Sequence, residues 1–82
     1  MNISEFVDFV KRLTDNTVQS QKDIMDNYSL GLISFREYME KMDIVADRYD
    51  EEINSAAMAT ANQARVSIDY LRGWCAHESV TF

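Results

Sequence analysis

The chain contains no proline, and only two of its 82 residues are glycine, Gly31 and Gly73. These residue types are the strongest breakers of regular structure, so two long stretches of the chain can continue without interruption. Apolar residues make up 46% of the sequence and charged residues 27%, which is typical of a folded protein. We therefore predict an all-α fold, and at this length a single helical domain spanning residues 1–82.

Cysteine and histidine are equally scarce, with one residue of each, Cys75 and His77. A lone cysteine cannot form an internal disulfide and no leader is recognisable, which favours a cytoplasmic location. Two ligands are too few for a closed zinc site, and a catalytic Cys–His pair needs a third group to orient it. The sequence also lacks a Glu-x-x-His motif, a phosphate-binding loop and a Ser-His-Asp set. We therefore expect no enzyme activity, no cofactor and no metal.

Long apolar runs and an excess of basic residues are also missing. No eighteen consecutive residues are apolar, as a membrane span requires, so we expect no membrane association. The net charge is −6, which disfavours direct binding to nucleic acid or to anionic lipid. A protein partner is the expectation that remains.

The residues that are present predict a long antiparallel helical hairpin. Asn2 and Glu5 have the spacing of a capping box, so the first helix is expected over about residues 2–30, and Gly31 can end it in the left-handed conformation. Ser34 and Glu37 form a second capping box, and apolar residues then recur at spacings of three and four. This pattern predicts one helix over about residues 34–72.

Two further features concern the second half of the chain. Gly73 resembles a helix stop, which would leave residues 74–82 as a non-helical or frayed tail. Low-propensity residues gather near residues 54–62, so a break there, giving a three-helix bundle, is the alternative to one continuous helix.

The segment between the helices resembles the calcium loop of the EF-hand family over 13 residues. The matching residues are Asp26 at loop position one, Gly31 at six, Ile33 at eight, Ser34 at nine, Glu37 at twelve and Tyr38 after it. The family places oxygen ligands at positions three and five, where this chain has Tyr28 and Leu30. A plain hinge is therefore the favoured interpretation, and a vestigial cation site is the alternative.

The unequal lengths of the two predicted helices suggest an oligomer. Folding the first helix on the second leaves about four turns uncovered, roughly residues 62–76, which carry large apolar side chains. We therefore expect a homodimer, with a kinked three-helix monomer as the competing solution. The expected dimer interface comprises Ala57, Ala61, Ala64, Ile68 and Leu71.

Two surfaces could bind a partner. Between residues 37 and 52 the chain has seven acids and two basic residues, and five of these acids share one helical face. This acidic ridge consists of Glu40, Asp43, Asp47, Asp50 and Glu51. The second surface is a cluster of residue types enriched at binding hot spots, namely Arg65, Tyr70, Arg72 and Trp74. The ordinary interpretations are a solvated face for the ridge, and core or dimer packing for Trp74 and Leu71.

These observations predict a small acidic interaction protein, an adaptor or inhibitor that binds the surface of another macromolecule. One alternative is a ligand-responsive module, with either the cation loop or a small-molecule site between the helices. The other is a purely structural oligomerisation unit.

Overall fold

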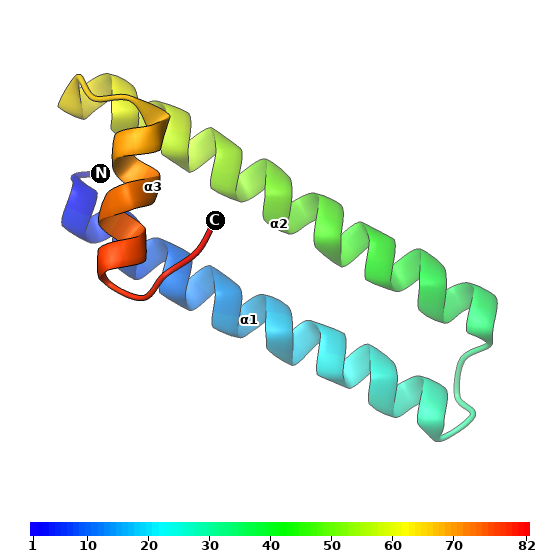
Figure 1. Cartoon of the computed structure of the whole chain (residues 1–82). Helices are drawn as coiled ribbons and strands as arrows, with labels where there is room; N and C mark the ends of the chain where they lie inside the picture. Colours follow the sequence, from blue (N-terminus) through cyan, green and yellow to red (C-terminus); the bar gives the residue numbers. More distant parts are fainter.

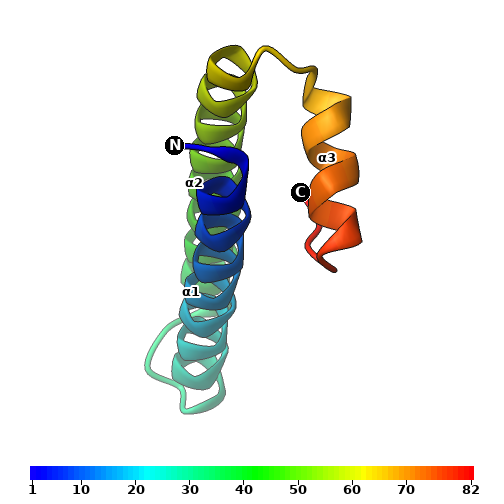
Figure 2. The ribbon, with the colours of Figure 1, turned by 90° about the vertical axis from the view of Figure 1, so that its left-hand side faces the viewer.

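The computed structural model describes all 82 residues and contains three helices, α1 (Ile3–Ser29), α2 (Phe35–Ala64) and α3 (Ile68–His77). In Figure 1, α1 and α2 run antiparallel as a hairpin, and α3 folds back at the end where the chain begins. Figure 2 shows α3 on one side of the hairpin only. The all-α prediction is confirmed, and the molecule measures 48 × 19 × 17 Å. None of the three helices has both the length and the apolarity of a membrane span.

The ends of the hairpin lie where their local chemistry predicts. The side chain of Asn2 accepts from the Glu5 amide at 2.8 Å, and Glu5 accepts from the Asn2 amide at 3.2 Å, which completes the capping box. Ser34 caps α2 by accepting from the Glu37 amide at 3.1 Å, but the return bond from the Ser34 amide to the Glu37 side chain does not form, so only half of the predicted second capping box is present. Gly31 has a φ of 75°. Its amide donates to the Tyr28 carbonyl while the next amide reaches Asn27, a Schellman motif that ends α1.

The end of α2 differs from the prediction. The helix does not continue to residue 72 but ends at Ala64, where Arg65 takes a left-handed φ of 57°. The Arg65 amide donates to Asn62 at 3.3 Å and the Val66 amide to Ala61 at 3.0 Å, so α2 also ends in a Schellman motif, without a glycine.

The alternative of three helices with a break near residues 54–62 is confirmed in the number of helices, and the break comes just after that range, at Arg65. Residues 54–62 are helical, and Ala57, Thr60 and Ala61 among them are buried. Packing of these small side chains outweighs the weak helix propensity of their neighbours.

The helix stop predicted at Gly73 is also wrong. Ser67 caps α3 by accepting from the Tyr70 amide at 3.1 Å, and the helix passes through Gly73 to His77. Residues 74–77 are therefore helical, and the non-helical end of the chain begins at Glu78. The reason is packing, since Leu71 and Cys75, four residues apart on α3, are both completely buried.

The apolar core lies at one end of the molecule, where all three helices meet. Its nine buried residues are Phe6, Val7, Val10, Ile53, Ala57, Ala61, Leu71, Cys75 and Val80. The chain terminus completes it, because the Phe82 ring packs edge-on against Phe6 at 5.3 Å. We call this end the base, and we call residues 14–50 the arm. No side chain from Lys11 to Glu52 is buried.

The position of α3 removes the reason to expect a dimer from helix lengths. The uncovered overhang does not exist, because α3 turns back and buries Leu71 against the hairpin. Tyr70 and Trp74 remain about half exposed on its outer side.

Candidate binding surfaces

The acidic ridge lies along the exposed side of α2. All five of its residues are exposed. Only Glu40 forms an ion pair, with Arg36 at 3.5 Å, and both side chains of that pair are largely in water. An exposed ion pair of this kind contributes little to the stability of the fold. The ridge is therefore a row of solvent-facing carboxylates along one helix.

The predicted cluster of arginines and aromatics does not form. Tyr70 and Trp74 are four residues apart and share one face of α3. Arg72 points elsewhere: its Nε donates to the Phe82 carbonyl at 3.1 Å, and its guanidinium lies 5.2 Å from the centre of the Phe82 ring. Arg65 occupies the connection between α2 and α3. Arg72 therefore anchors the end of the chain, and Tyr70 and Trp74 form a smaller aromatic surface.

The predicted dimer interface is mostly inside the molecule. Ala57, Ala61 and Leu71 are buried in the core of the single chain, so a second copy cannot contact them. Ile68 is partly buried and Ala64 is exposed. The small residues Ala57 and Ala61 pack into the core that the three helices form within one chain.

The segment that resembles a calcium loop is a hinge of five residues, 30–34. Because α1 continues to Ser29, the first four residues of the would-be loop, from Asp26, are helical. No three His, Cys, Asp or Glu side chains of the structure come together in a way that could hold a metal ion. An aromatic cluster lies beside the hinge, where the Tyr28 ring is 5.9 Å from Phe35 and 5.1 Å from Tyr38.

Cys75 and His77 are not arranged as a reactive pair. They are two residues apart on α3, so their side chains point in nearly opposite directions, about 160° apart around the helix. The Cys75 thiol is buried in the base, and this burial raises its pKa. His77 is exposed in the last turn of α3. A less acidic thiol in an apolar interior is a packing group.

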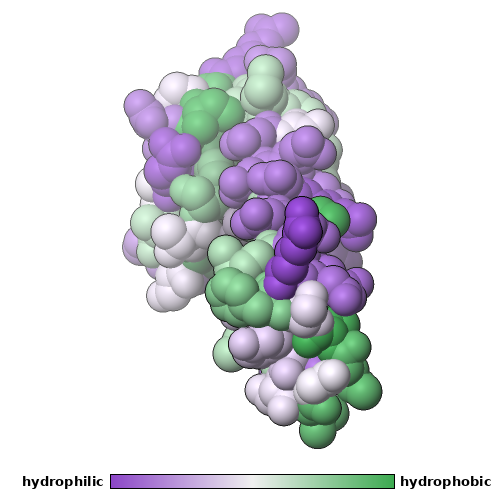
Figure 3. All heavy atoms as spheres, turned by 90° about the vertical axis from the view of Figure 1, so that its right-hand side faces the viewer, coloured by the Kyte–Doolittle hydropathy of each residue, from purple (hydrophilic) through white to green (hydrophobic).

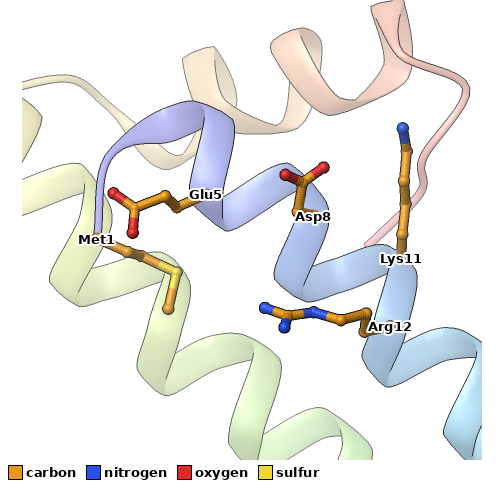
Figure 4. Close-up of a pocket in the computed structure, with 5 residues that line it drawn as sticks. All are labelled: Met1, Glu5, Asp8, Lys11 and Arg12. Carbon is orange, nitrogen blue, oxygen red and sulfur yellow. The ribbon is translucent and has the colours of Figure 1, made fainter.

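The largest surface depression, about 470 Å³, lies on the first turns of α1. It is lined by Met1, Glu5, Asp8, Lys11 and Arg12, and no ion pair joins its two acids to its two bases. Figure 4 shows these charged groups spread along α1, with Lys11 and Arg12 pointing in different directions. No set of polar groups converges here on one ligand.

A second depression, of about 260 Å³, lies in the seam between α1 and α2. Its lining comprises Thr14, Thr17, Val18, Gln21, Ala46, Tyr49 and Asp50. Thr14 and Tyr49 join the two helices across the seam through a hydrogen bond of 3.2 Å between their hydroxyl groups. Val18 and Ala46 lie on the same side of the hairpin, because both line this depression.

The arm exposes an unusual amount of apolar surface that the sequence did not single out. Eight large apolar residues of the arm are more than 40% exposed: Val18, Met25, Tyr28, Leu30, Leu32, Phe35, Met39 and Ile44. Figure 3 looks at the hinge end and shows apolar side chains gathered there beside charged ones. The available signal was the width of the apolar stripe on α1, where Val18 and Met25 lie alongside the residues that face α2.

Comparison of the chain with known protein families, with curated protein sequences and with solved structures finds no match in any of the three.

Proposed function

We propose that this protein is a non-enzymatic binding protein, an adaptor or inhibitor that acts by docking its helical arm on another protein. The observation that carries this proposal is the arm itself, which buries no side chain and exposes eight large apolar ones. Apolar side chains gather at the hinge end of the arm (Figure 3), and a gathered apolar surface of this kind usually marks an interaction site.

The charge of the molecule supports a protein partner with a basic surface. Four of the five carboxylates of the acidic ridge lie on the arm, and the fifth, Glu51, directly follows it on α2. Such a row of charges speeds association with an oppositely charged partner and selects against acidic ones. The net charge of −6 favours such a partner over nucleic acid. The lone thiol supports a cytoplasmic location for the complex.

A structural oligomerisation unit is the second candidate function, because the same apolar residues could pair with a second copy of the arm. A homodimer would then be the working form. This homodimer is supported by the exposed apolar residues of the arm, whereas the unequal helix lengths that first suggested a dimer do not support it.

The test is capture on the immobilised full chain, with the variant Asp43→Lys/Asp47→Lys/Asp50→Lys as matched control. We expect a protein that the parent chain retains and the variant releases, and that binds the parent again after purification. Circular dichroism should match between the two chains, because the changed side chains are exposed. If no purified protein distinguishes them and sedimentation reports a stable dimer, the structural unit is correct and the adaptor proposal is wrong.

A further inference from the structure

One face of the hairpin is covered at the base by α3 and continues uncovered along the arm. On α2, residues seven apart share a face of the hairpin. Ile53 and Thr60, at the base, are 4% and 0% exposed. Ala46 and Met39 occupy the same stripe one and two heptads before Ile53 and are exposed, Met39 by 46%. The stripe that is buried at the base is therefore exposed along the arm, with no helix over it.

The same change occurs along α1. Val7 is buried at the base, whereas Tyr28, near the other end of α1, is 41% exposed. Between them lie Val18 and Met25, seven residues apart and 56% and 51% exposed. At the hinge the two helices join, because the rings of Tyr28 and Phe35 are in contact. We call Val18, Met25, Tyr28, Phe35 and Met39 the apolar face.

A groove connects this face to the base. The depression of about 260 Å³ between α1 and α2 includes Val18 from one helix and Ala46 from the other. Thr14 lines it and also lines a neighbouring depression against Ser79, Val80 and Thr81. The groove thus lies next to residues 79–81, which pack beside Thr14. A helix placed in it would continue the layer that α3 starts.

The charges around the groove select its occupant. Asp50 lines the groove, and Asp47 and Asp43 precede it on the same side of α2 at spacings of three and four. On the α1 side the groove itself is lined by no charged residue, and the neighbouring depression has one charge of each sign, Lys11 and Asp15. A second copy would bring another chain of charge −6 to this acidic border. A helix with apolar residues on one side and lysine or arginine along one flank satisfies both parts of the surface.

We propose, as a deeper statement of the function proposed above and resting on it, that the apolar face binds an amphipathic helix of a partner protein, with that helix's basic flank against Asp43, Asp47 and Asp50. The helix would lie in the groove between α1 and α2 and form a three-helix arrangement along the arm, as α3 does at the base.

The test uses two synthetic helical peptides with the same leucines at spacings of three and four, one flanked by lysines and the other by glutamates. We expect the lysine peptide to cause saturable amide shifts in residues 14–25 and 39–50 of the full chain. The glutamate peptide should bind at least tenfold more weakly. The variant Asp43→Lys/Asp47→Lys/Asp50→Lys should reverse this preference.

A matched pair of variants distinguishes binding at the apolar face from non-specific binding to any exposed apolar side chain. Val18→Glu should weaken binding of the lysine peptide at least tenfold. Ile44→Glu should leave it unchanged, because Ile44 is equally exposed, at 57% against 56%, but lies two residues from Ala46 and so on the opposite side of α2. Both positions are exposed, so both variants should fold, which circular dichroism verifies.

Three results would overturn the assignment: no binding of the lysine peptide at millimolar concentration, equal loss in the Val18→Glu and Ile44→Glu variants, or a dimer that Val18→Glu abolishes. The last result would show that a second copy of the chain, not a partner helix, binds the apolar face. The proposed function fails separately, since a partner captured through the acidic ridge could persist even when the peptide does not bind.

Discussion

Thr60 is the one buried polar side chain of the molecule. It is 0% exposed, and its Oγ1 has no hydrogen-bond partner. A buried hydroxyl without a partner loses its hydration and gains nothing in exchange. Valine has nearly the same shape and no hydroxyl. We expect Thr60→Val to raise the free energy of unfolding by about 1 kcal/mol, measured by urea denaturation.

Thr14→Val is the matched control, because the Thr14 hydroxyl does have a partner, Tyr49, at 3.2 Å. This change should lower the free energy of unfolding by roughly 0.5–1 kcal/mol. If Thr60→Val also lowers it, the Thr60 hydroxyl has a hydrogen-bond partner in solution, and the base is not dry around this side chain.

Cys75 makes stability depend on pH in the alkaline range. Burial raises the pKa of this thiol above its usual value. Below the usual value the thiol is protonated in both the folded and the unfolded chain and has no effect on the pH dependence. Above it, the unfolded chain releases the proton and the folded chain keeps it, so the free energy of unfolding falls as pH rises.

The measurement compares urea unfolding of the parent and of Cys75→Ala at pH values on both sides of the usual thiol range. The parent should lose more stability than the variant across that range. An identical loss in both chains would mean that the thiol titrates as it does in water, and that the base is open to solvent.

At the scale of the elements, α1 and α2 end in the same motif with different residues in the left-handed position. Gly31 adopts it without strain, whereas Arg65 has a Cβ and a φ of 57°. We expect Arg65→Gly to raise the free energy of unfolding by roughly 0.5–1 kcal/mol, because the strain removed exceeds the added freedom of the unfolded chain. Thermal melting monitored by circular dichroism measures it.

Ala59→Gly is the control for this change, since it places the same residue type at an exposed position inside α2. It should lower the free energy of unfolding by about 1 kcal/mol. If the two glycine variants change stability in the same direction, the Arg65 conformation is not strained.

The two helix ends also explain which elements the sequence could predict. The start of α1 and the hinge were predictable, because capping boxes and a left-handed glycine act within a few residues. The end of α2 was not, because an arginine gives no local stop signal. At Gly73 the local stop signal is present but is overridden by packing. Leu71 and Cys75 are both completely buried, and their packing keeps the helix continuous past Gly73.

The candidate site divides in the same way. The acidic ridge could be predicted, because charge and spacing along one helix depend only on the local sequence. The apolar face could not, because the exposure of Val18 and Met39 depends on how far α3 reaches along the hairpin. For the same reason Ala57 and Ala61, which have the small size expected of a helix interface, were assigned to the wrong partner.

At the scale of the whole molecule, the base and the arm differ in how many buried side chains stabilise them. All ten buried residues belong to the base, and the arm is a two-helix projection with water on most of its surface. Local opening free energy follows the number of buried apolar contacts. The base should therefore open only with global unfolding, and the arm should open more easily.

Native-state hydrogen exchange measures this difference residue by residue. We expect the opening free energy that governs exchange to be lower by about 2 kcal/mol or more for amides of residues 20–45 than for amides of residues 53–61 and 71–75. The lysine-flanked peptide should raise the protection of residues 20–45 and leave the base unchanged, because a third helix would give the arm the packing that α3 gives the base. Equal protection of arm and base without peptide would show that the hairpin unfolds as one unit. The arm would then be as stable as the base without a third helix.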